Sequence, residues 1–454
     1  MLDTDLLLLI LLILAGGKIL GTISERLGFP SIIGELLVGI VMVLLLPEMI
    51  NKYTTDLEFM ANLGVMLMMF IMGLSINIET VMKANARSAT AITLIGASLV
   101  FVVATFFTLI IDLAMGQEFY YSLAQACIVG VALTSTSTVI GFRYLTAIGD
   151  RFSNVFKTLV AVEVTDGIFS IVLLAVFLSV IGVYTTMVAS GGGADFSKLV
   201  PEIGWSSFKL CLLILGFMIL VIKFGGKVAN WLLGISRRSG EDDTIITLSL
   251  VILFGVAWLS DWLQLTPVIG AFLAGAILAG SPFSETVIAP KIKAVGYGLF
   301  IPIFFAFIGM KMDFGAIFGG ASLSVLGIGI PYYFLLFLLL LAGVLVSKYI
   351  GAIAGCAYAG GFKPFEANKI GSSAICVGED TLVIAQIGST VLFAVGTAEG
   401  QPLVTSQIFS VLGLLIIVTS IITPLLLNIT FSKSKTQVPA LRSRNKHRSR
   451  GGGL

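Results

Sequence analysis

Long apolar segments recur along the whole chain and are separated by short polar loops. Each is long enough to cross, or nearly cross, about 30 Å of hydrocarbon as a helix. We predict thirteen such helices, at approximately 5–24, 31–47, 58–78, 88–112, 119–142, 153–184, 206–234, 244–262, 265–281, 295–312, 325–357, 368–396 and 403–430. The pattern therefore predicts an all-α polytopic membrane protein with about thirteen transmembrane helices.

The composition supports this fold class. Hydrophobic residues make up 57% of the 454 residues and charged residues 11%, and the mean hydropathy is +1.06. Soluble chains carry about 25% charged residues, so the surroundings of this fold should be mostly lipid bilayer. The first apolar run, 6–14, has no basic region before it and no cleavage site after it, and we interpret it as a first span rather than a signal peptide.

Side chains with catalytic or metal-binding chemistry are scarce. The four cysteines lie in apolar segments without metal-ligand spacing, and the one histidine, His447, lies in a polar tail. The sequence contains no recognisable nucleophile–base set, phosphate-cradling glycine loop or metal cluster. We therefore expect a protein that is not an enzyme and has no cofactor and no nucleic acid partner.

The distribution of basic residues predicts the orientation in the membrane. Loops after odd-numbered spans carry most of the lysines and arginines, whereas loops after even-numbered spans carry few. Basic residues mark the cytoplasmic side, so we expect the N-terminus outside and the C-terminus inside the cell membrane. The basic loop residues on the expected inner side are Arg26, Lys83, Arg87, Arg143, Arg151, Arg237, Arg238, Lys291, Lys293, Lys363 and Lys369.

Short motifs repeat at a nearly constant offset. The segment 34–39 (GELLVG) resembles 270–275 (GAFLAG), and 70–74 (FIMGL) resembles 307–310 (FIGM). The first glycine of 34–39 and Gly73 each lie 236 residues before their counterparts, Gly270 and Gly309. The segment 164–170 also resembles 404–410, at an offset of 240. These matches pair helices seven spans apart, so the second copy enters the membrane from the opposite side.

This pairing predicts a domain organisation. We expect a first inverted-repeat half at 1–184, a linker span within 185–240, a second half at 241–430 and a basic disordered cytoplasmic tail at 431–454. Inverted repeats are typical of secondary transporters, whose substrate site lies near the membrane midplane at interrupted helices. The tail either contacts anionic lipid headgroups or only fixes the topology.

Asp166 is the leading candidate for a transport site. It lies well inside the sixth predicted span, where an ionised carboxylate costs roughly 3 kcal/mol, and intramembrane acids are functional by default. Loss of water favours the neutral acid, so one carboxylate could hold either a proton or a transported monovalent cation. Glu163 shares its helical face and is either a second titrating group or a residue that reaches toward the cytoplasmic end.

Five consecutive hydroxyl residues, 134–138, predict an interruption of the fifth span. Thr134, Ser135, Thr136 and Ser137 would offer oxygen ligands to a dehydrated cation, although hydroxyls hydrogen-bonded within a continuous helix remain the alternative. Span twelve would supply the partner interruption of an inverted repeat. We expect that second interruption at Gly371, Ser372 and Ser373, with Gly378 following.

Three further charged residues lie within predicted spans. Lys348 lies deep in span eleven, where a buried ammonium needs a partner; we expect that partner to be Asp166, with extension toward the cytoplasmic interface as the alternative. Glu379 and Asp380 follow Gly378 in span twelve and would line a cytoplasmic funnel or the site itself.

Three motifs resemble the cation:proton antiporter superfamily, specifically its Kef-type K⁺/H⁺ and NapA-type Na⁺/H⁺ branch. They are 27–39 (LGFPSIIGELLVG), 263–275 (LQLTPVIGAFLAG) and 302–310 (PIFF followed by GM). The resemblance covers most of 6–427 and implies a 6+1+6 inverted repeat of the NhaA/NapA type, with two crossing broken helices and a homodimer.

The resemblance also implies roles for single residues. Thr165 and Asp166 occupy the family's two-residue motif, whose carboxylate binds cation and proton, and Lys348 resembles the basic partner of that carboxylate. The pair Thr-Asp departs from the usual Asp-Asp, Asn-Asp or Gln-Asp, so the choice among Na⁺, K⁺ and Li⁺ and the stoichiometry stay open. A cation channel and a Na⁺-coupled organic solute symporter are the alternative functions.

Overall fold

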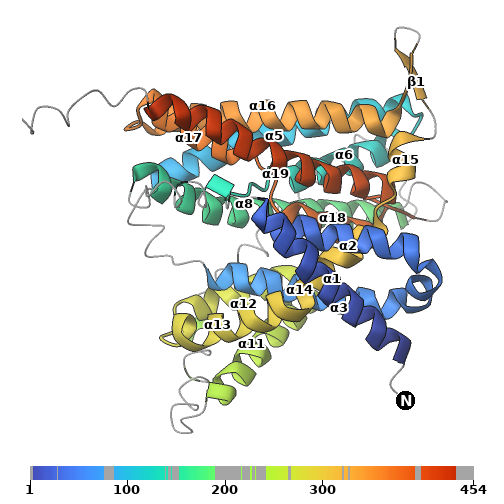
Figure 1. Ribbon diagram of the computed structural model, residues 1–454, viewed down its shortest axis with the longest axis vertical. Coiled ribbons are helices and arrows are strands. Elements are labelled where there is room, and N and C mark those ends of the chain that lie inside the picture. The colour runs from blue at the N-terminus through green and yellow to red at the C-terminus, as the bar shows by residue number, and fades with distance from the viewer. Residues whose placement is uncertain are drawn as a thin grey trace, which may run out of the picture.

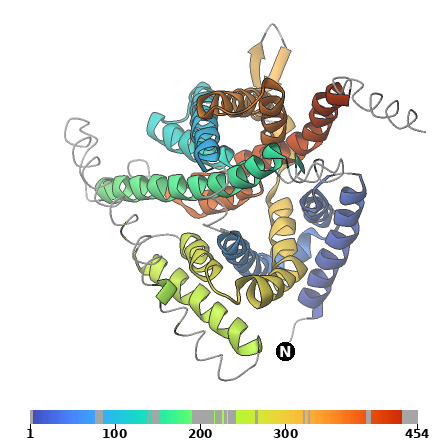
Figure 2. The same ribbon diagram turned by 90° about the vertical axis from the view of Figure 1, so that its left-hand side faces the viewer.

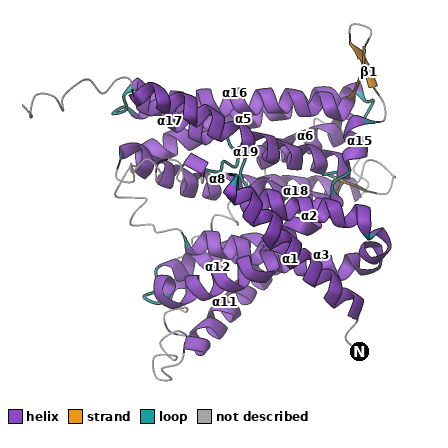
Figure 3. Ribbon diagram, viewed as in Figure 1, coloured by secondary structure: helices purple, strands orange, loops and turns teal. Residues whose placement is uncertain are grey.

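The molecule is almost entirely helical (Figure 3). The computed structural model describes residues 4–27, 29–75, 86–138, 140–141, 145, 153–189, 216, 225–227, 231, 242–263, 267–319, 322–325, 328–393 and 400–435. Eight described helices are long and apolar enough to cross a membrane, and three shorter apolar ones lie at Ser31–Leu45, Phe119–Thr134 and Pro267–Ala279. With one interrupted span at 364–390, they account for twelve of the thirteen predicted segments. The seventh, 206–234, lies almost wholly outside the described residues.

The helices form two bundles, seen in Figure 1 and, from the side, in Figure 2. The scaffold bundle contains α1 (Thr4–Arg26), α2 (Ser31–Leu45), α3 (Pro47–Leu74), α11 (Asp242–Trp262), α12 (Pro267–Ala279), α13 (Ala289–Val295) and α14 (Ile301–Lys311), with the π-helical turns η2 (Ser284–Ile288) and η3 (Gly296–Phe300). The core bundle contains α5 (Ala86–Ala114), α6 (Phe119–Thr134), α8 (Asn154–Ala189), α16 (Tyr332–Ala359), α17 (Pro364–Ala374), α18 (Asp380–Thr390) and α19 (Ser406–Lys435). The short α15 (Phe314–Phe318) joins them and packs against α16 and α19.

The structure changes several predicted boundaries, including the start of span eleven and the start of the tail. Span eleven was expected from 325, but a hairpin of β1 (Ser322–Val325) and β2 (Ile328–Pro331) precedes the helix, which begins at Tyr332. Gly329 weakens helix there and Pro331 lacks an N–H, so this stretch suits a turn and a helix start better than a helix interior. The tail was expected to be disordered from 431, but α19 continues through Lys435, and the rest of the tail lies outside the described residues.

The first and last described helices begin and end on opposite sides of the molecule. The start of α1 is on the same side as the β1–β2 hairpin, and α19 ends on the other side (Figure 1). A second short hairpin, of β3 (Leu392–Phe393) and β4 (Gln401–Pro402), lies between α18 and α19.

Glycines at the repeat offset make reciprocal contacts in the scaffold bundle. A Cβ added to Gly39 on α2 would lie 1.9 Å from the carbonyl oxygen of Ala306 on α14. A Cβ added to Gly275 on α12 would lie 2.1 Å from the carbonyl oxygen of Phe70 on α3. Adding 236 to the number of Gly39 gives Gly275, and subtracting 236 from the number of Ala306 gives Phe70. The two contacts therefore occupy equivalent positions with the two halves exchanged. A two-fold axis between the halves would produce this pattern, which also holds for Gly309 against Leu36 and Gly73 against Phe272. The contact of Gly34 with Leu20 lies within one half, and it recurs as Gly270 against Val256 with both partners moved up by 236.

We expect Gly39→Ala to lower the free energy of unfolding by about 1–3 kcal/mol, because the new methyl group overpacks a backbone contact that cannot move locally. The unfolding midpoint of the detergent-purified protein would measure this loss. Gly255→Ala is the matched control, since Gly255 also lies inside a helix and has nothing within 4 Å of an added Cβ. Equal midpoints for the two variants would contradict a close α2–α14 contact.

Candidate functional site

Two interrupted helices cross inside the core bundle. α6 ends at Thr134, and the chain continues through Ser135–Thr138 in a non-helical conformation, as the run of hydroxyl residues predicts. α17 ends at Ala374 and α18 begins at Asp380. Thr136 and Val377 form an antiparallel bridge between the two interruptions, with Ser137 N donating to Cys376 O at 3.0 Å and Gly378 N to Ser135 O at 3.3 Å. These bonds satisfy backbone groups that the helices leave unpaired, as burial in a membrane requires.

The prediction of the second interruption at Gly371, Ser372 and Ser373 is wrong, because all three lie inside α17. Gly371 lets the ring of Tyr349 approach its helix, and an added Cβ would lie 3.1 Å from that ring. The Ser373 hydroxyl donates to Lys369 O at 2.8 Å, and the Ser372 hydroxyl bonds that of Thr430 at 2.9 Å. Their small size and polarity therefore serve helix packing, and the interruption lies at 375–379.

Asp166 lies on α8 beside this crossing. Its side chain is 4% exposed, and its Oδ2 atom has no hydrogen-bond partner. Thr136 interacts with the carboxylate through its hydroxyl group and its backbone N–H. A small cavity of about 20 Å³ is lined by Asp166, Thr134, Thr136 and Lys348. The neighbouring Thr165 hydroxyl donates to Ala161 O of its own helix at 2.7 Å and does not line this cavity.

Lys348 is buried on α16, with 3% of its surface exposed, and its ammonium points into the crossing rather than toward an interface. The ammonium donates to the carbonyl oxygen of Ser135 and to the Thr136 hydroxyl, the latter at 3.1 Å. Ser135 follows the C-terminal end of α6, where the helix dipole favours a cation. Among the described residues, no carboxylate lies within 4.0 Å of the ammonium, so Thr136 stands between Lys348 and Asp166 where a direct ion pair was expected.

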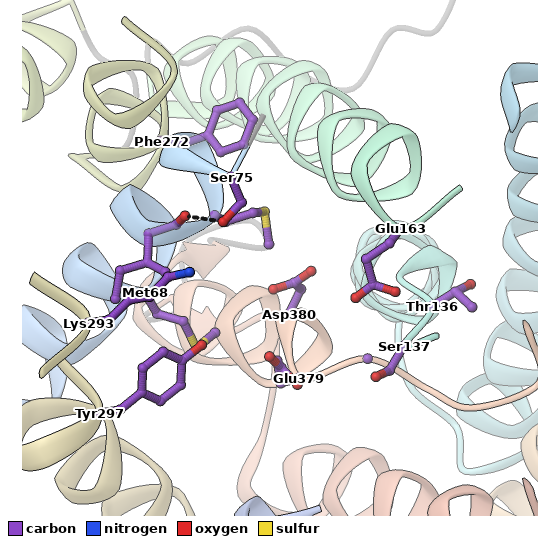
Figure 4. A pocket seen from close by; sticks show the side chains of 13 residues that line it. Met68, Ser75, Thr136, Ser137, Glu163, Phe272, Lys293, Tyr297, Glu379 and Asp380 are labelled. Carbon is purple, nitrogen blue, oxygen red and sulfur yellow. Dashed lines mark hydrogen bonds between the residues drawn. The ribbon is translucent and has the colours of Figure 1, made fainter. Parts of the chain in front are cut away.

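A larger acidic cavity of about 290 Å³ lies on the other side of Thr136, which lines both cavities. Glu163, Glu379 and Asp380 line it from the core bundle (Figure 4). Side chains of the scaffold bundle, including Ser75, Lys293 and Tyr297, form the facing wall. The cavity therefore lies between the two bundles and reaches the crossing without containing Asp166.

The acids in this cavity differ in their partners. The Glu163 carboxylate accepts from the backbone N–H of Thr138 at 2.6 Å and also from the Thr138 hydroxyl, so it holds the end of the first interruption. Asp380 Oδ2 accepts from the Ser135 hydroxyl at 3.2 Å, whereas its Oδ1 has no partner. Asp380 is in the first turn of α18 and Glu379 precedes it, where the helix dipole favours negative charge.

Residues 9–433 match the family model described as sodium/hydrogen exchanger, transmembrane. The chain belongs to this exchanger family. The antiporter GerN of Bacillus cereus, named a Na⁺/H⁺-K⁺ antiporter, is 29% identical over 93% of this chain and 95% of its own length. A Na⁺/H⁺ antiporter of Enterococcus hirae is 26% identical over 92% of this chain and 95% of its own length.

Solved structures support the same exchanger fold. The sodium–proton antiporter MjNhaP1 of Methanocaldococcus jannaschii aligns with a TM-score of 0.56 at 14% identity, covering 94% of this chain and 97% of the other. The potassium-efflux protein KefC of Shigella flexneri is 26% identical over 69% of this chain and 46% of its own length. The antiporter GerN and KefC, rather than the distant solved structure, support the Kef-type and NapA-type branch that the three motifs indicate.

Sequence reasoning about this exchanger missed several residues of the crossing. Thr138 was predicted as part of the interruption but not as a site residue, although its N–H and hydroxyl bind the Glu163 carboxylate. Ile375, Cys376 and Val377 had a usable signal, because adding the repeat offset of 240 to Ser135–Ser137 gives 375–377. Tyr297 and Lys293 carried no signal, because only the packing of the bundles brings them to the acidic cavity.

Proposed function

We infer that this protein is a secondary active transporter that exchanges a monovalent cation, Na⁺ or K⁺, for protons. Family membership supports the class of activity, and the names of the relatives support both cations and the proton as substrates. The single observation that carries the site is Asp166, a buried carboxylate with an unpartnered oxygen beside two crossing interrupted helices. We propose that proton and cation compete for this carboxylate.

The surrounding oxygens fit a small dehydrated cation. The Asp166 carboxylate, the Thr136 hydroxyl and backbone carbonyls freed at the end of α6 are the hard oxygen ligands that such ions prefer. Lys348 now holds the Ser135 carbonyl and the Thr136 hydroxyl. An arriving cation would take over these oxygens and displace the ammonium, so binding of the ion and the position of Lys348 are linked.

The acidic cavity suggests the route to this site. Its three carboxylates outnumber the one ammonium, that of Lys293, so the ionised lining would be net negative and would raise the local cation concentration. Thr136 separates the cavity from Asp166, so a small shift of the crossing relative to the scaffold bundle would connect them. Alternating access would then follow from movement of the core bundle against the scaffold bundle.

The organisation around the site is part of this proposal. We propose that 1–184 and 241–430 are inverted halves joined by a linker span within 185–240. The protein would lie in the cell membrane with its N-terminus outside and its C-terminus in the cytoplasm, as the basic loops indicate. Two chains would form a homodimer through their scaffold bundles. The reciprocal glycine contacts of α2 with α14 and of α3 with α12 support the inverted halves.

Neither alternative function is favoured. A channel does not need a titratable carboxylate beside a buried ammonium. An organic solute would not fit the cavity of about 20 Å³ at Asp166, which is close to the size of one water molecule. The names of the relatives likewise describe antiporters.

A panel of cations on reconstituted protein tests the function. We expect Na⁺ or K⁺ added to acid-loaded proteoliposomes to drive proton efflux, with the membrane potential clamped by an ionophore that does not carry the tested ion. Repeating the assay without the clamp reports whether exchange moves net charge. Electrical current without movement of protons would contradict antiport and revive the channel.

A further inference from the structure

A second buried carboxylate, Asp112, lies far from the crossing. It is in the last turn of α5, two residues before the helix ends at Ala114, and its side chain is 0% exposed. Neither of its oxygens has a hydrogen-bond partner. Thr108, one turn earlier on the same helical face, is also fully buried with an unpartnered hydroxyl.

The neighbours of Asp112 supply no positive charge. The titratable groups that interact with it are the phenols of Tyr121 on α6 and Tyr333 on α16. Among the residues that the structure describes, no lysine or arginine lies within 4.0 Å of the carboxylate. The hydroxyl of Ser122, next to Tyr121, is buried and unpartnered as well. An isolated ionised carboxylate is unstable in such surroundings, so the neutral acid with a bound proton is the form that this packing favours.

Tyr121 connects this residue to a cap over the same end of the core bundle. Its hydroxyl donates to Pro402 O at 2.8 Å, and Gln125 Nε2, one turn further on, donates to Leu403 O at 2.9 Å. Leu403 N in turn donates to Val391 O at 3.0 Å. We call the segments 391–393 and 400–404, which contain β3 and β4, the outer cap, because they lie at the same end of the core bundle as the start of α6 and Asp112.

We propose that Asp112 is a second proton-binding residue, and that loss of its proton to external water at alkaline pH loosens the outer cap. The ionised carboxylate would draw water and hydrogen-bond donors toward itself, and among the hydroxyl groups around Asp112, that of Tyr121 is the one that donates to the outer cap. A Tyr121 hydroxyl that turns to Asp112 leaves the Pro402 carbonyl unpaired. The cap thereby responds to the proton concentration on its own side of the membrane.

The position of Asp112 gives this response a route to the transport site. α6 carries Tyr121 near its start and Thr134 at its end, and α16 carries Tyr333 near its start and Lys348 further along. Both helices that face Asp112 therefore also reach the crossing. The inference rests on the proposed function in two respects: that Asp166 is the transport site, and that the end of the core bundle with the outer cap faces the outside. Binding of the proton and loosening of the cap are measurable without transport.

Infrared difference spectroscopy of the wild-type protein tests the proton. Between neutral and alkaline pH, we expect loss of the carbonyl stretching band of a neutral, buried carboxylic acid. The band should be absent in Asp112→Asn and present in Asp166→Asn. In protein that carries isotope-labelled aspartate, Asp112→Glu should remove the labelled band while keeping an acid at this position, which covers failure of the Asn variant to fold. A spectrum in which every such band survives in the Asp112 variants would overturn the proposal.

Hydrogen exchange of the outer cap tests the coupling. At alkaline pH, we expect the amides of 391–393 and 400–404 to exchange several-fold faster in wild type than in Asp112→Asn, and at the same rate in both near neutral pH. Comparison at equal pH removes the intrinsic base catalysis of exchange. Glu118→Gln, an exposed acid just before α6, is the control and should behave as wild type. Equal exchange in wild type and Asp112→Asn at alkaline pH would overturn the coupling, whatever Asp166→Asn does to transport.

Discussion

Replacing Asp166 with Asn should abolish exchange driven by a pH gradient, leaving proteoliposomes at the flux of empty vesicles. The amide has nearly the shape of the carboxyl group but neither binds a proton at accessible pH nor neutralises a cation. Thr136 can still bond the amide oxygen, so the crossing should keep its packing. The measurement is cation-dependent proton flux together with the unfolding of the purified variant. We expect its free energy of unfolding to lie within about 1 kcal/mol of the wild-type value.

Asp243→Asn is the matched control for this substitution. Its carboxylate lies on α11 with the side chain 98% exposed and makes one contact of 3.5 Å with Lys291. Exposed ion pairs contribute about 0–1 kcal/mol, so exchange and stability should stay near wild type. Undiminished exchange in Asp166→Asn would remove that residue from the transport site, even if the membrane topology survived.

Replacing Lys348 with Met should lower the exchange rate by more than about tenfold and destabilise the protein by about 1–3 kcal/mol. The substitution keeps the long apolar stem but leaves the Ser135 carbonyl and the Thr136 hydroxyl without their buried donor. It also removes the positive charge that compensates the end of α6 and the nearby carboxylate. Flux and unfolding midpoint, measured on the same preparation, test both parts of this expectation.

Lys311→Met separates the role of a buried ammonium from that of any lysine. Lys311 ends α14, is 29% exposed and pairs with the partly exposed Glu58 at 3.2 Å, so its loss should cost less than about 1 kcal/mol. If Lys348→Met kept wild-type flux, the ammonium would be a structural support of the crossing and no part of the exchange cycle.

The linear sequence by itself located almost every membrane helix that the structure describes. Hydrocarbon thickness fixes how long an apolar segment must be, and charged residues are so costly in lipid that the segment ends are marked in the sequence. The same cost singled out Asp166 and Lys348, because an ionisable residue amid apolar neighbours needs a reason to be there. The hydroxyl run at 134–138 likewise located the first interruption, since five such residues compete with the helix for its own hydrogen bonds.

Only the tertiary structure decided how these groups meet. Small polar residues occur both where helices pack closely and where they are interrupted, so the sequence could not decide which role Gly371, Ser372 and Ser373 have. The structure shows close packing, because Gly371 lies against Tyr349 and Ser372 bonds Thr430. Lys348 was matched to Asp166 by charge, yet the crossing offers it the Ser135 carbonyl and the Thr136 hydroxyl. The acidic cavity draws its walls from both bundles. Contacts between segments hundreds of residues apart depend on how helices pack, and apolar spacing along one helix carries no information about which partner it will face.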